Sequence, residues 1–212
     1  MSNDIWKIFL VGPVTMASQA YDDVAPRYDA AMRPLERWFL KRWRAELFAE
    51  LPEHGMILEV GAGTGLNFEF YPRAAVGVAI EPSIEMLKIA KNKTRPERLT
   101  LVQSVAEKLP FQDASFDIAF ASLVMCTVES PETVFSELRR VVRPGGTVVL
   151  LDHVRPDGVL GPVFDVLNMV IAPLCGDHVN RRTAKIASAA GLEVQLIQKR
   201  GLGIFNLITC RV

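Results

Sequence analysis

Short apolar runs alternate with helical patterns through the middle of the chain. Five runs have the length and apolar content of buried strands, at residues 56–60, 74–80, 99–103, 116–121 and 147–151. Strands this apolar must be covered on both faces, and their alternation with helices is typical of a largely parallel sheet. The pattern therefore predicts a doubly wound α/β fold.

Helix start and stop signals separate these runs. Residues 84–93 have a helical pattern and follow Ser83, whose hydroxyl suits the N-cap of a helix. Pro131 is predicted to occupy the first position of another helix. The Arg-Pro-Gly-Gly segment at residues 143–146 is expected to end that helix before the fifth strand begins.

One domain is predicted over residues 1–212, because a chain of this length buries a sizeable core and no linker or repeat interrupts it. We expect four parts: an N-terminal helical cap (1–51), a core (55–155), an insertion on the acceptor side (156–190) and closing strands (191–212). The insertion contains an apolar segment at 163–174 and a helix near 180–190. The closing strands at 192–197 and 204–211, the last one antiparallel, bring the sheet to seven strands.

Composition limits the function classes. The chain has 24 basic and 24 acidic side chains and no formal net charge, which argues against a dedicated nucleic-acid partner. The cysteines Cys126, Cys175 and Cys210 are far apart, and no CxxC or Cys/His cluster occurs along the sequence. Neither a disulfide framework nor a metal site is expected, so a reducing cytoplasm is the default location. The apolar stretch at residues 5–16 is shorter than the about 20 residues that a membrane span needs.

A glycine run after the first strand points to a ligand site. Gly61, Gly63 and Gly65 permit a tight turn and a close approach of a ligand to the backbone. Glu81 ends the second strand, where a carboxylate is well placed to accept from both hydroxyls of a ribose. Nucleotides and S-adenosylmethionine both suit this geometry, and a solvated strand-end carboxylate is the alternative for Glu81.

Five segments in order resemble those of class I S-adenosylmethionine-dependent methyltransferases of the quinone-methyltransferase-like superfamily. They are Glu-Val-Gly-Ala-Gly-Thr-Gly at 59–65, Ile-Glu-Pro-Ser at 80–83, Ala-Glu-Lys-Leu-Pro-Phe at 106–111, Ser-Phe-Asp at 115–117 and Arg-Pro-Gly-Gly at 143–146. As a set they distinguish a methyl-donor site from that of a nicotinamide dehydrogenase. The resemblance implies a Rossmann-like sheet and S-adenosylmethionine as the cofactor, with S-adenosylhomocysteine as its product.

The same resemblance implies roles for matching residues on the donor side. The methionine part would be held by Glu59 and by the turn of Gly61, Ala62, Gly63 and Gly65. Glu81 would hold the ribose. Ser122 and Leu123 would line the position of methyl transfer.

The adenine would lie between two further pairs, Pro82 with Ser83 and Ala106 with Glu107. Many relatives carry Asp or Asn just before the Ala-Glu pair, where it accepts from the adenine amino group. This chain has Ser104 and Val105 there, so Ser104 or backbone groups are expected to make that contact.

Candidate acceptor residues come from both ends of the core. Residues 21–29 resemble the cap of quinone C-methyltransferases and phospholipid N-methyltransferases, which implies that Tyr21 and Tyr28 close over the acceptor and the cofactor; packing of the first helix is the alternative. Asp152 and His153 end the fifth strand, where ligands collect. His153 is a candidate proton acceptor, with Asp152 a candidate to fix its tautomer, although strand neighbours face opposite ways. Capping of the sheet is the alternative for His153.

The segment at 152–154 (Asp-His-Val) resembles bacterial phosphatidylethanolamine N-methyltransferases and the methyltransferase-like 7 thiol methyltransferases more than the quinone enzymes. Downstream, His178 is a second candidate proton acceptor. Arg181 and Arg182 are candidates to bind a phosphate. A solvated loop is the alternative for these three residues.

Other features suit an amphipathic acceptor. Basic and aromatic residues interleave on the predicted N-terminal helix, as at anionic interfaces: Arg33, Arg37, Lys41, Arg42 and Arg44 with Trp38, Phe39 and Trp43. Aromatics packed on the sheet with solvated arginines outside are the alternative. Residues 5–14 and 163–174 are candidates to bury a lipid chain, the second with ordinary core as its alternative. Cys126 is expected to be a packed, inert thiol.

We therefore predict an S-adenosylmethionine-dependent methyltransferase, cytoplasmic or at a membrane surface, that acts on a small or amphipathic acceptor. The amine of phosphatidylethanolamine is the first choice. A carbon of a quinone precursor and a small thiol are the alternatives within the class. A non-catalytic S-adenosylmethionine-binding regulator is the alternative outside it.

Overall fold

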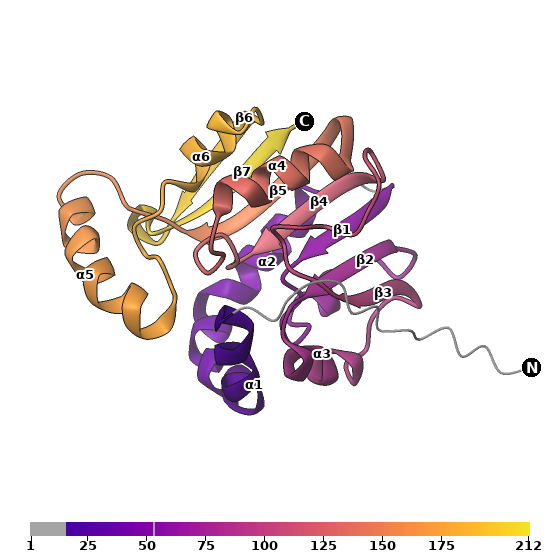
Figure 1. Cartoon of the computed structure of the whole chain (residues 1–212), viewed down its shortest axis with the longest axis horizontal. Helices are drawn as coiled ribbons and strands as arrows, with labels where there is room; N and C mark the ends of the chain where they lie inside the picture. The colour runs from indigo at the N-terminus through magenta and orange to yellow at the C-terminus, as the bar shows by residue number, and fades with distance from the viewer. Residues whose placement is uncertain (1–15, 53) are drawn as a thin grey trace, which may run out of the picture.

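The computed structural model describes residues 16–52 and 54–212 and contains a seven-stranded sheet in the order β3-β2-β1-β4-β5-β7-β6 (Figure 1). The strands are β1 (Met56–Val60), β2 (Val76–Glu81), β3 (Arg98–Gln103), β4 (Phe116–Ser122), β5 (Val142–His153), β6 (Glu193–Arg200) and β7 (Phe205–Arg211). Strands β1 to β5 run parallel, whereas β7 is antiparallel to β5 and to β6. The predicted doubly wound α/β fold with an antiparallel C-terminal strand is confirmed.

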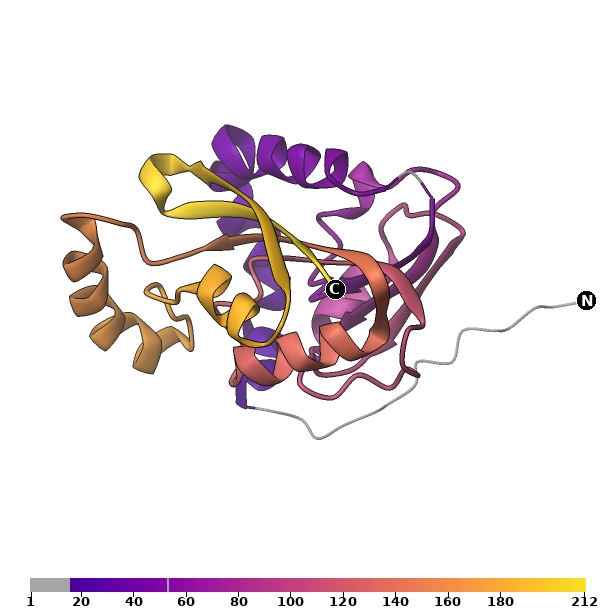
Figure 2. The same cartoon turned by 90° about the horizontal axis from the view of Figure 1, so that it is seen from above.

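Helices cover both faces of the sheet and make three layers (Figures 1 and 2). The helices are α1 (Met16–Leu35), α2 (Lys41–Ala49), α3 (Ile84–Lys91), α4 (Pro131–Val141), α5 (Leu160–Cys175) and α6 (Thr183–Ala189). On one face, α4 buries Phe135 and Leu138, and α6 buries Ala187. On the other face, α2 buries Trp43 and Leu47. The alternating side chains of each strand thus divide between two apolar clusters.

The N-terminal helix is continuous but changes its period. Between α1 and α2 lies a π-helical turn, η1 (Glu36–Leu40). A π turn adds a residue to the helical repeat, so the helix faces before and after it point in different directions. As a result α2 packs on the sheet, whereas α1 lies against α3 at the edge where the parallel strands end (Figure 1).

Two predicted strand starts are wrong by two residues or more. β2 begins at Val76 instead of residue 74, because residues 72–75 form a turn closed by a backbone hydrogen bond. β5 begins at Val142 instead of residue 147, so the Arg-Pro-Gly-Gly segment belongs to the strand instead of separating it from α4. The backbone of this segment pairs with the end of the chain, since the Gly145 N–H donates to the Val212 carbonyl at 2.7 Å.

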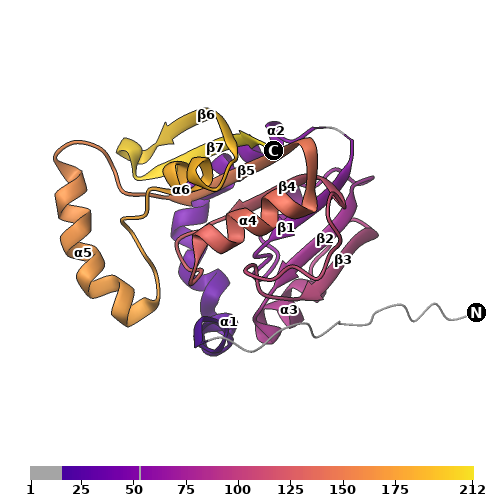
Figure 3. The ribbon, with the colours of Figure 1, turned by 45° about the horizontal axis from the view of Figure 1, so that its top comes forward.

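Helix α5 stands away from the rest of the molecule (Figures 1 and 3). Its base is held by Arg155, which pairs with Asp165 at 2.7 Å. Apolar side chains near and along it are 43–88% exposed, namely Val159, Val163, Val166, Leu167, Met169 and Val170. The apolar segment predicted at 163–174 is therefore not ordinary core. Within residues 16–52 and 54–212, no helix combines the length and the hydropathy needed to cross a bilayer. The segment predicted to bury lipid at 5–14 lies outside the described residues.

Two leucines of the sheet test this layered core. Leu150 on β5 is fully buried, with paired strands on both sides, whereas Leu196 on β6 is 42% exposed. Leu150→Ala should lower the free energy of unfolding by about 2–5 kcal/mol, because it removes buried methyl groups and leaves a cavity. Leu196→Ala should change it by at most about 0.5 kcal/mol. Urea denaturation measures both, and equal losses would contradict the layering.

Candidate active site

A pocket opens at the edge of the sheet where the parallel strands end. Ligands of open α/β sheets bind preferentially at this edge. The wall combines the chain that follows β1, β2, β3 and β4 with two side chains of α1. Eleven of the residues predicted for the site line it: Tyr21, Tyr28, Gly61, Gly63, Glu81, Pro82, Ser104, Ala106, Glu107, Ser122 and Leu123.

The glycine turn brings bare backbone to this pocket. Gly61 and Gly63 have φ of +74° and +54°, a region that L side chains rarely adopt. A Cβ at Gly63 would meet nothing within 4 Å, so its surroundings are open for a ligand. A Cβ at Gly61 would lie 2.3 Å from Cγ2 of Val124, so only glycine lets the loop after β4 approach.

Three other predicted residues shape the site without lining it. Ala62 and Gly65 close the turn, since the Ala62 N–H donates to Ile80 and the Gly65 N–H donates to Ala62, both at 2.9 Å. Ser83 is the N-cap of α3, as predicted, because its hydroxyl accepts from the Met86 N–H at 3.1 Å.

Glu81 is buried at the pocket, at the end of β2. Its carboxylate accepts from the N–H of Ser83 at 3.0 Å and from the N–H of Gly63 at 2.9 Å. Burial raises the pKa of Glu81 to about 7, although these two hydrogen bonds lower it. The nearby charge of Asp22 raises the pKa further. The solvated alternative for Glu81 is thus wrong.

Glu59 is a predicted site residue that does not line the pocket. It is fully buried on the face of the sheet that α2 covers. Its carboxylate accepts from the Asn67 amide at 2.7 Å and from the Tyr71 hydroxyl at 2.8 Å. Burial raises the pKa of Glu59 to about 7 in spite of these bonds. Glu59 thus lies behind the wall of the pocket, and its contact with the methionine part stays a prediction.

Arg44 completes a buried polar network with Glu59. It donates to Oδ1 of Asn67 at 2.7 Å and to Oγ of Ser122 at 2.6 Å, and it pairs with Glu36 at 2.8 Å. Only 4% of Arg44 is exposed, so this arginine is not part of a solvated basic face. The network connects α2 to Ser122, which lines the pocket.

The two tyrosines of α1 form the cover of the pocket. The rings of Tyr21 and Tyr28 meet edge to face, with centroids 6.4 Å apart, and both line the pocket. Burial raises the pKa of Tyr28 to about 12 and that of Tyr21 further, so both phenols stay neutral. Helix packing alone does not account for their position.

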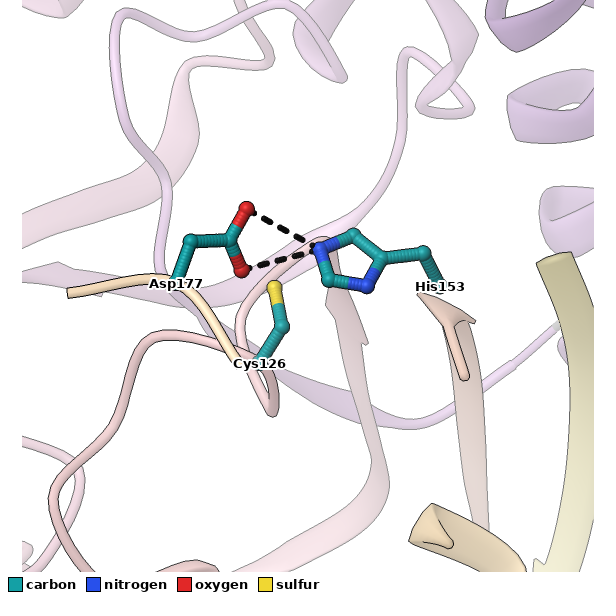
Figure 4. Close-up of side chains that lie close together, drawn as sticks. All are labelled: Cys126, His153 and Asp177. Carbon is teal, nitrogen blue, oxygen red and sulfur yellow. Dashed lines mark hydrogen bonds and ion pairs between the residues drawn. The ribbon is translucent and has the colours of Figure 1, made fainter. Parts of the chain in front are cut away.

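Beside the pocket, His153 meets Asp177 instead of Asp152 (Figure 4). Nε2 of His153 lies 2.9 Å and 3.1 Å from the two carboxylate oxygens of Asp177. Burial opposes the charge of His153, yet this bond and the two nearby carboxylates raise its pKa. Asp152 accepts from the Thr183 hydroxyl at 3.2 Å, and no hydrogen bond joins it to His153 in the described part of the chain. Asp177 was missed because only folding brings it to the end of β5.

Cys126 lies in the same cluster, buried as predicted. Burial raises the pKa of its thiol well above the ordinary value. A backbone hydrogen bond joins the loop that contains Cys126 to the loop after α5. The carbonyl of Cys126 accepts from the His178 N–H at 2.9 Å. Arg181 donates to the carbonyls of Met125 and Val128, which does not favour a phosphate role for it. Arg182 remains exposed.

Sequence reasoning missed part of the pocket. The additional lining residues are Val60, Ile80, Met86, Val105, Val124, Thr127, Val128 and Glu129. The rule that ligands gather at the carboxyl ends of parallel strands points to the loop after β4, which supplies four of them. Leu123 begins this loop with φ of +58°, a strained backbone conformation for leucine and one that the sequence does not reveal.

The methyltransferase domain family matches residues 58–150. A demethylmenaquinone methyltransferase of Renibacterium salmoninarum is 35% identical over 64% of this chain and 58% of its own length. Thiol S-methyltransferase TMT1B of Mus musculus is 31% identical over 72% and 69%. A phosphatidylethanolamine N-methyltransferase of Cereibacter sphaeroides is 34% identical over 66% and 76%. The match thus spans between half and about three quarters of these relatives.

A solved structure supports the fold. A methyltransferase of Thermotoga maritima, described as S-adenosylmethionine-dependent and as a possible histamine N-methyltransferase, superposes with a TM-score of 0.69. The two share 22% sequence identity over 92% of this chain and 99% of the other. At this identity the likeness concerns the arrangement of strands and helices.

The buried network around Arg44 should contribute to the free energy of unfolding. Arg44→Ala should lower the free energy of unfolding by about 3–5 kcal/mol, because it leaves Glu36 and Asn67 without their buried partner. Arg42→Ala is the control, since Arg42 is 84% exposed in its pair with Glu46 and its loss should cost at most about 1 kcal/mol. Chemical denaturation of both variants would show equal losses if the network were unimportant.

Proposed function

Because this chain belongs to the class I S-adenosylmethionine-dependent methyltransferases, we propose that it methylates an amphipathic acceptor taken from a lipid surface. The amine of phosphatidylethanolamine is our first choice. The cofactor supplies a methyl group already activated by the positive charge of its sulfur. What remains for the chain is to align the two reactants and to exclude water.

On the donor side, we assign the ribose to Glu81. Each of its oxygens accepts one backbone N–H and retains lone-pair capacity for a ribose hydroxyl. The backbone of Gly61 and Gly63 would take the methionine part, where no Cβ fills the space next to Gly63. The adenine would lie between Pro82 and the segment from Ser104 to Glu107, all of which line the pocket.

On the acceptor side, Ser122 and Leu123 would line the position of methyl transfer, and Tyr21 with Tyr28 would exclude water. The tyrosines are neutral and largely buried, so they cover the site without adding charge. His153 and His178 stay predictions as proton acceptors, as does Arg182 as a phosphate contact.

The observation that carries the lipid proposal is α5. It presents a row of exposed valine, leucine and methionine side chains beyond the end of β5. Exposed apolar surface of this kind marks a protein or membrane contact, and an apolar helix face suits a lipid interface. Arg33 and Arg37 are exposed on the helix that leads from the pocket cover, and Arg37 lies over the ring of Trp38. Their charges are complementary to phosphate groups.

The ribose assignment predicts a pH-dependent affinity for S-adenosylmethionine. The pKa of about 7 means that Glu81 is protonated in the free protein below that pH, while the ribose needs its charged form. Affinity should therefore fall by up to about tenfold per unit as the pH drops below 7, and level off above it. Glu81→Gln should bind roughly 10–100-fold more weakly, with little pH dependence in this range.

Calorimetric titration from about pH 5.5 to 8 measures both effects. The titratable neighbours are Asp22, Glu59, Tyr21 and Tyr28, and the raised pKa values keep the tyrosines neutral throughout. Glu59 also has a pKa of about 7 but is retained in Glu81→Gln, so a pH dependence that this variant loses belongs to Glu81. Glu85→Gln on α3 is the control and should keep the affinity and pH profile of the parent. A parent protein whose affinity does not change below pH 7 would contradict the assignment to Glu81.

The lipid proposal predicts a selective effect of α5. Val166→Asp combined with Val170→Asp should lower methyl transfer to phosphatidylethanolamine in vesicles by at least about tenfold, since each buried valine contributes roughly 1.5 kcal/mol. The affinity for S-adenosylmethionine should not change. Leu196→Asp is the control, because this side chain is exposed on β6 and outside the α5 surface.

A radiolabelled methyl-transfer assay offers phosphatidylethanolamine vesicles, quinone precursors and small thiols in parallel. Label in the lipid that is lost with the α5 variant supports the proposal. Label confined to a quinone or to a water-soluble thiol would contradict the lipid proposal. The acceptor would then be of the class named for other relatives. Binding of S-adenosylmethionine without transfer to any acceptor would favour a regulator.

A further inference from the structure

The geometry points to a zinc site formed by Cys126, His153 and Asp177, beside the pocket (Figure 4). It goes beyond the proposed methyl transfer and does not rest on it. The sequence offers no sign of such a site, because the three residues lie on separate segments: the loop after β4, the end of β5 and the loop after α5.

The donor atoms converge as zinc ligands do. Sγ of Cys126, a ring nitrogen of His153 and a carboxylate oxygen of Asp177 all lie within 4.8 Å of one another. The nitrogen-to-oxygen distance is already 2.9 Å. Sulfur, imidazole nitrogen and carboxylate oxygen are the ligands that Zn²⁺ takes, in a tetrahedral arrangement. A small contraction around Cys126 would complete three of its four corners.

The backbone holds these ligands in place. The His178 N–H donates to the Cys126 carbonyl at 2.9 Å, which fixes the loop of Asp177 to the loop of Cys126. Arg181 strengthens the same junction through the carbonyls of Met125 and Val128. Two loops that are joined on either side of the cluster provide a preformed frame for an ion.

The cluster combines acidic groups with few basic ones. The carboxylates of Asp152 and Asp177 both lie near the Cys126 thiol. The nearby basic side chains are His153, His178 and Arg181, and the guanidinium of Arg181 is used by backbone carbonyls. A divalent ion bound by a thiolate, a carboxylate and a neutral imidazole would balance these charges.

Two buried atoms of this neighbourhood have no hydrogen-bond partner in the described part of the chain, Oδ1 of Asp152 and Nδ1 of His153. Asp152 is only 1% exposed and accepts from Thr183 through its other oxygen. Buried polar atoms are rarely left unpaired, but neither of these two would bind the ion, because Nε2 of His153 is the nitrogen that faces Asp177. The metal proposal therefore rests on the three converging donor atoms.

Three protein ligands leave a fourth position for water or a substrate atom, as in catalytic zinc sites. Cys126 is preceded by Val124 and followed by Thr127 among the residues that line the pocket. An ion here would therefore lie beside the pocket, next to the loop that follows β4.

Metal binding is measured on the full chain with the metal alone. After treatment with a chelator, the parent protein should take up one Zn²⁺ per chain, and Co²⁺ should produce the near-ultraviolet absorption of a thiolate ligand. Cys126→Ser and Asp177→Asn should each weaken Zn²⁺ by more than roughly 100-fold, because even an outer-shell partner is worth about 10–100-fold. The Cys126 variant should also lose the Co²⁺–thiolate band.

Cys210→Ser is the matched control, since Cys210 is a buried thiol on β7, outside the cluster. It should bind Zn²⁺ like the parent. A parent protein that binds neither ion, or variants at Cys126 and Asp177 that bind as tightly as the parent, would overturn the proposal. Because Asp177 is partly exposed in a loop, its variant remains informative even if Cys126→Ser fails to fold.

Discussion

The buried charge of Arg44 is the interaction on which the arrangement of this molecule depends. Removing an arginine and a glutamate from water is costly, and the cost is met only when every donor and acceptor finds a partner. Here Asn67 sits between Arg44 and Glu59 and bonds to both. These contacts fix three elements at once: the helix that leads to the pocket cover, the chain after the glycine turn, and the end of β4 at Ser122. A fully satisfied network of this kind specifies one packing of the helix on the sheet.

The two halves of the site differ in construction. The donor half consists of strand ends and a glycine turn, anchored in the sheet and bonded through Glu81. The acceptor half consists of α1, α5 and two loops joined by a few hydrogen bonds. A fixed donor site beside variable flanking segments is how one fold serves several acceptors, and the named relatives act on a quinone, a thiol and a phospholipid amine.

The fold and the donor half were predictable, because they depend on local patterns: apolar runs, helix caps and the glycines before Glu81. The buried partners of Glu59 were not predicted, because they depend on the two-residue period of β1, which turns this side chain toward α2. The partners Arg44 and Asp177 were not identified, since each meets its contacts through tertiary packing. The π turn, which decides which helix face meets the sheet, also has no sequence signal that a regular helical period would show.

The strand order has a consequence for how the chain acquires its shape during synthesis. β5 is long and apolar, and its outer neighbour is β7, the last strand of the chain. Until residues 205–211 emerge from the ribosome, β5 is an open edge, able to pair with any extended segment that it encounters. The donor half of the sheet can form early, whereas protection of this edge waits for residues 205–211. A nascent chain of this topology therefore has its greatest exposure to aggregation, and its greatest need for a chaperone, in the interval between the synthesis of β5 and that of β7.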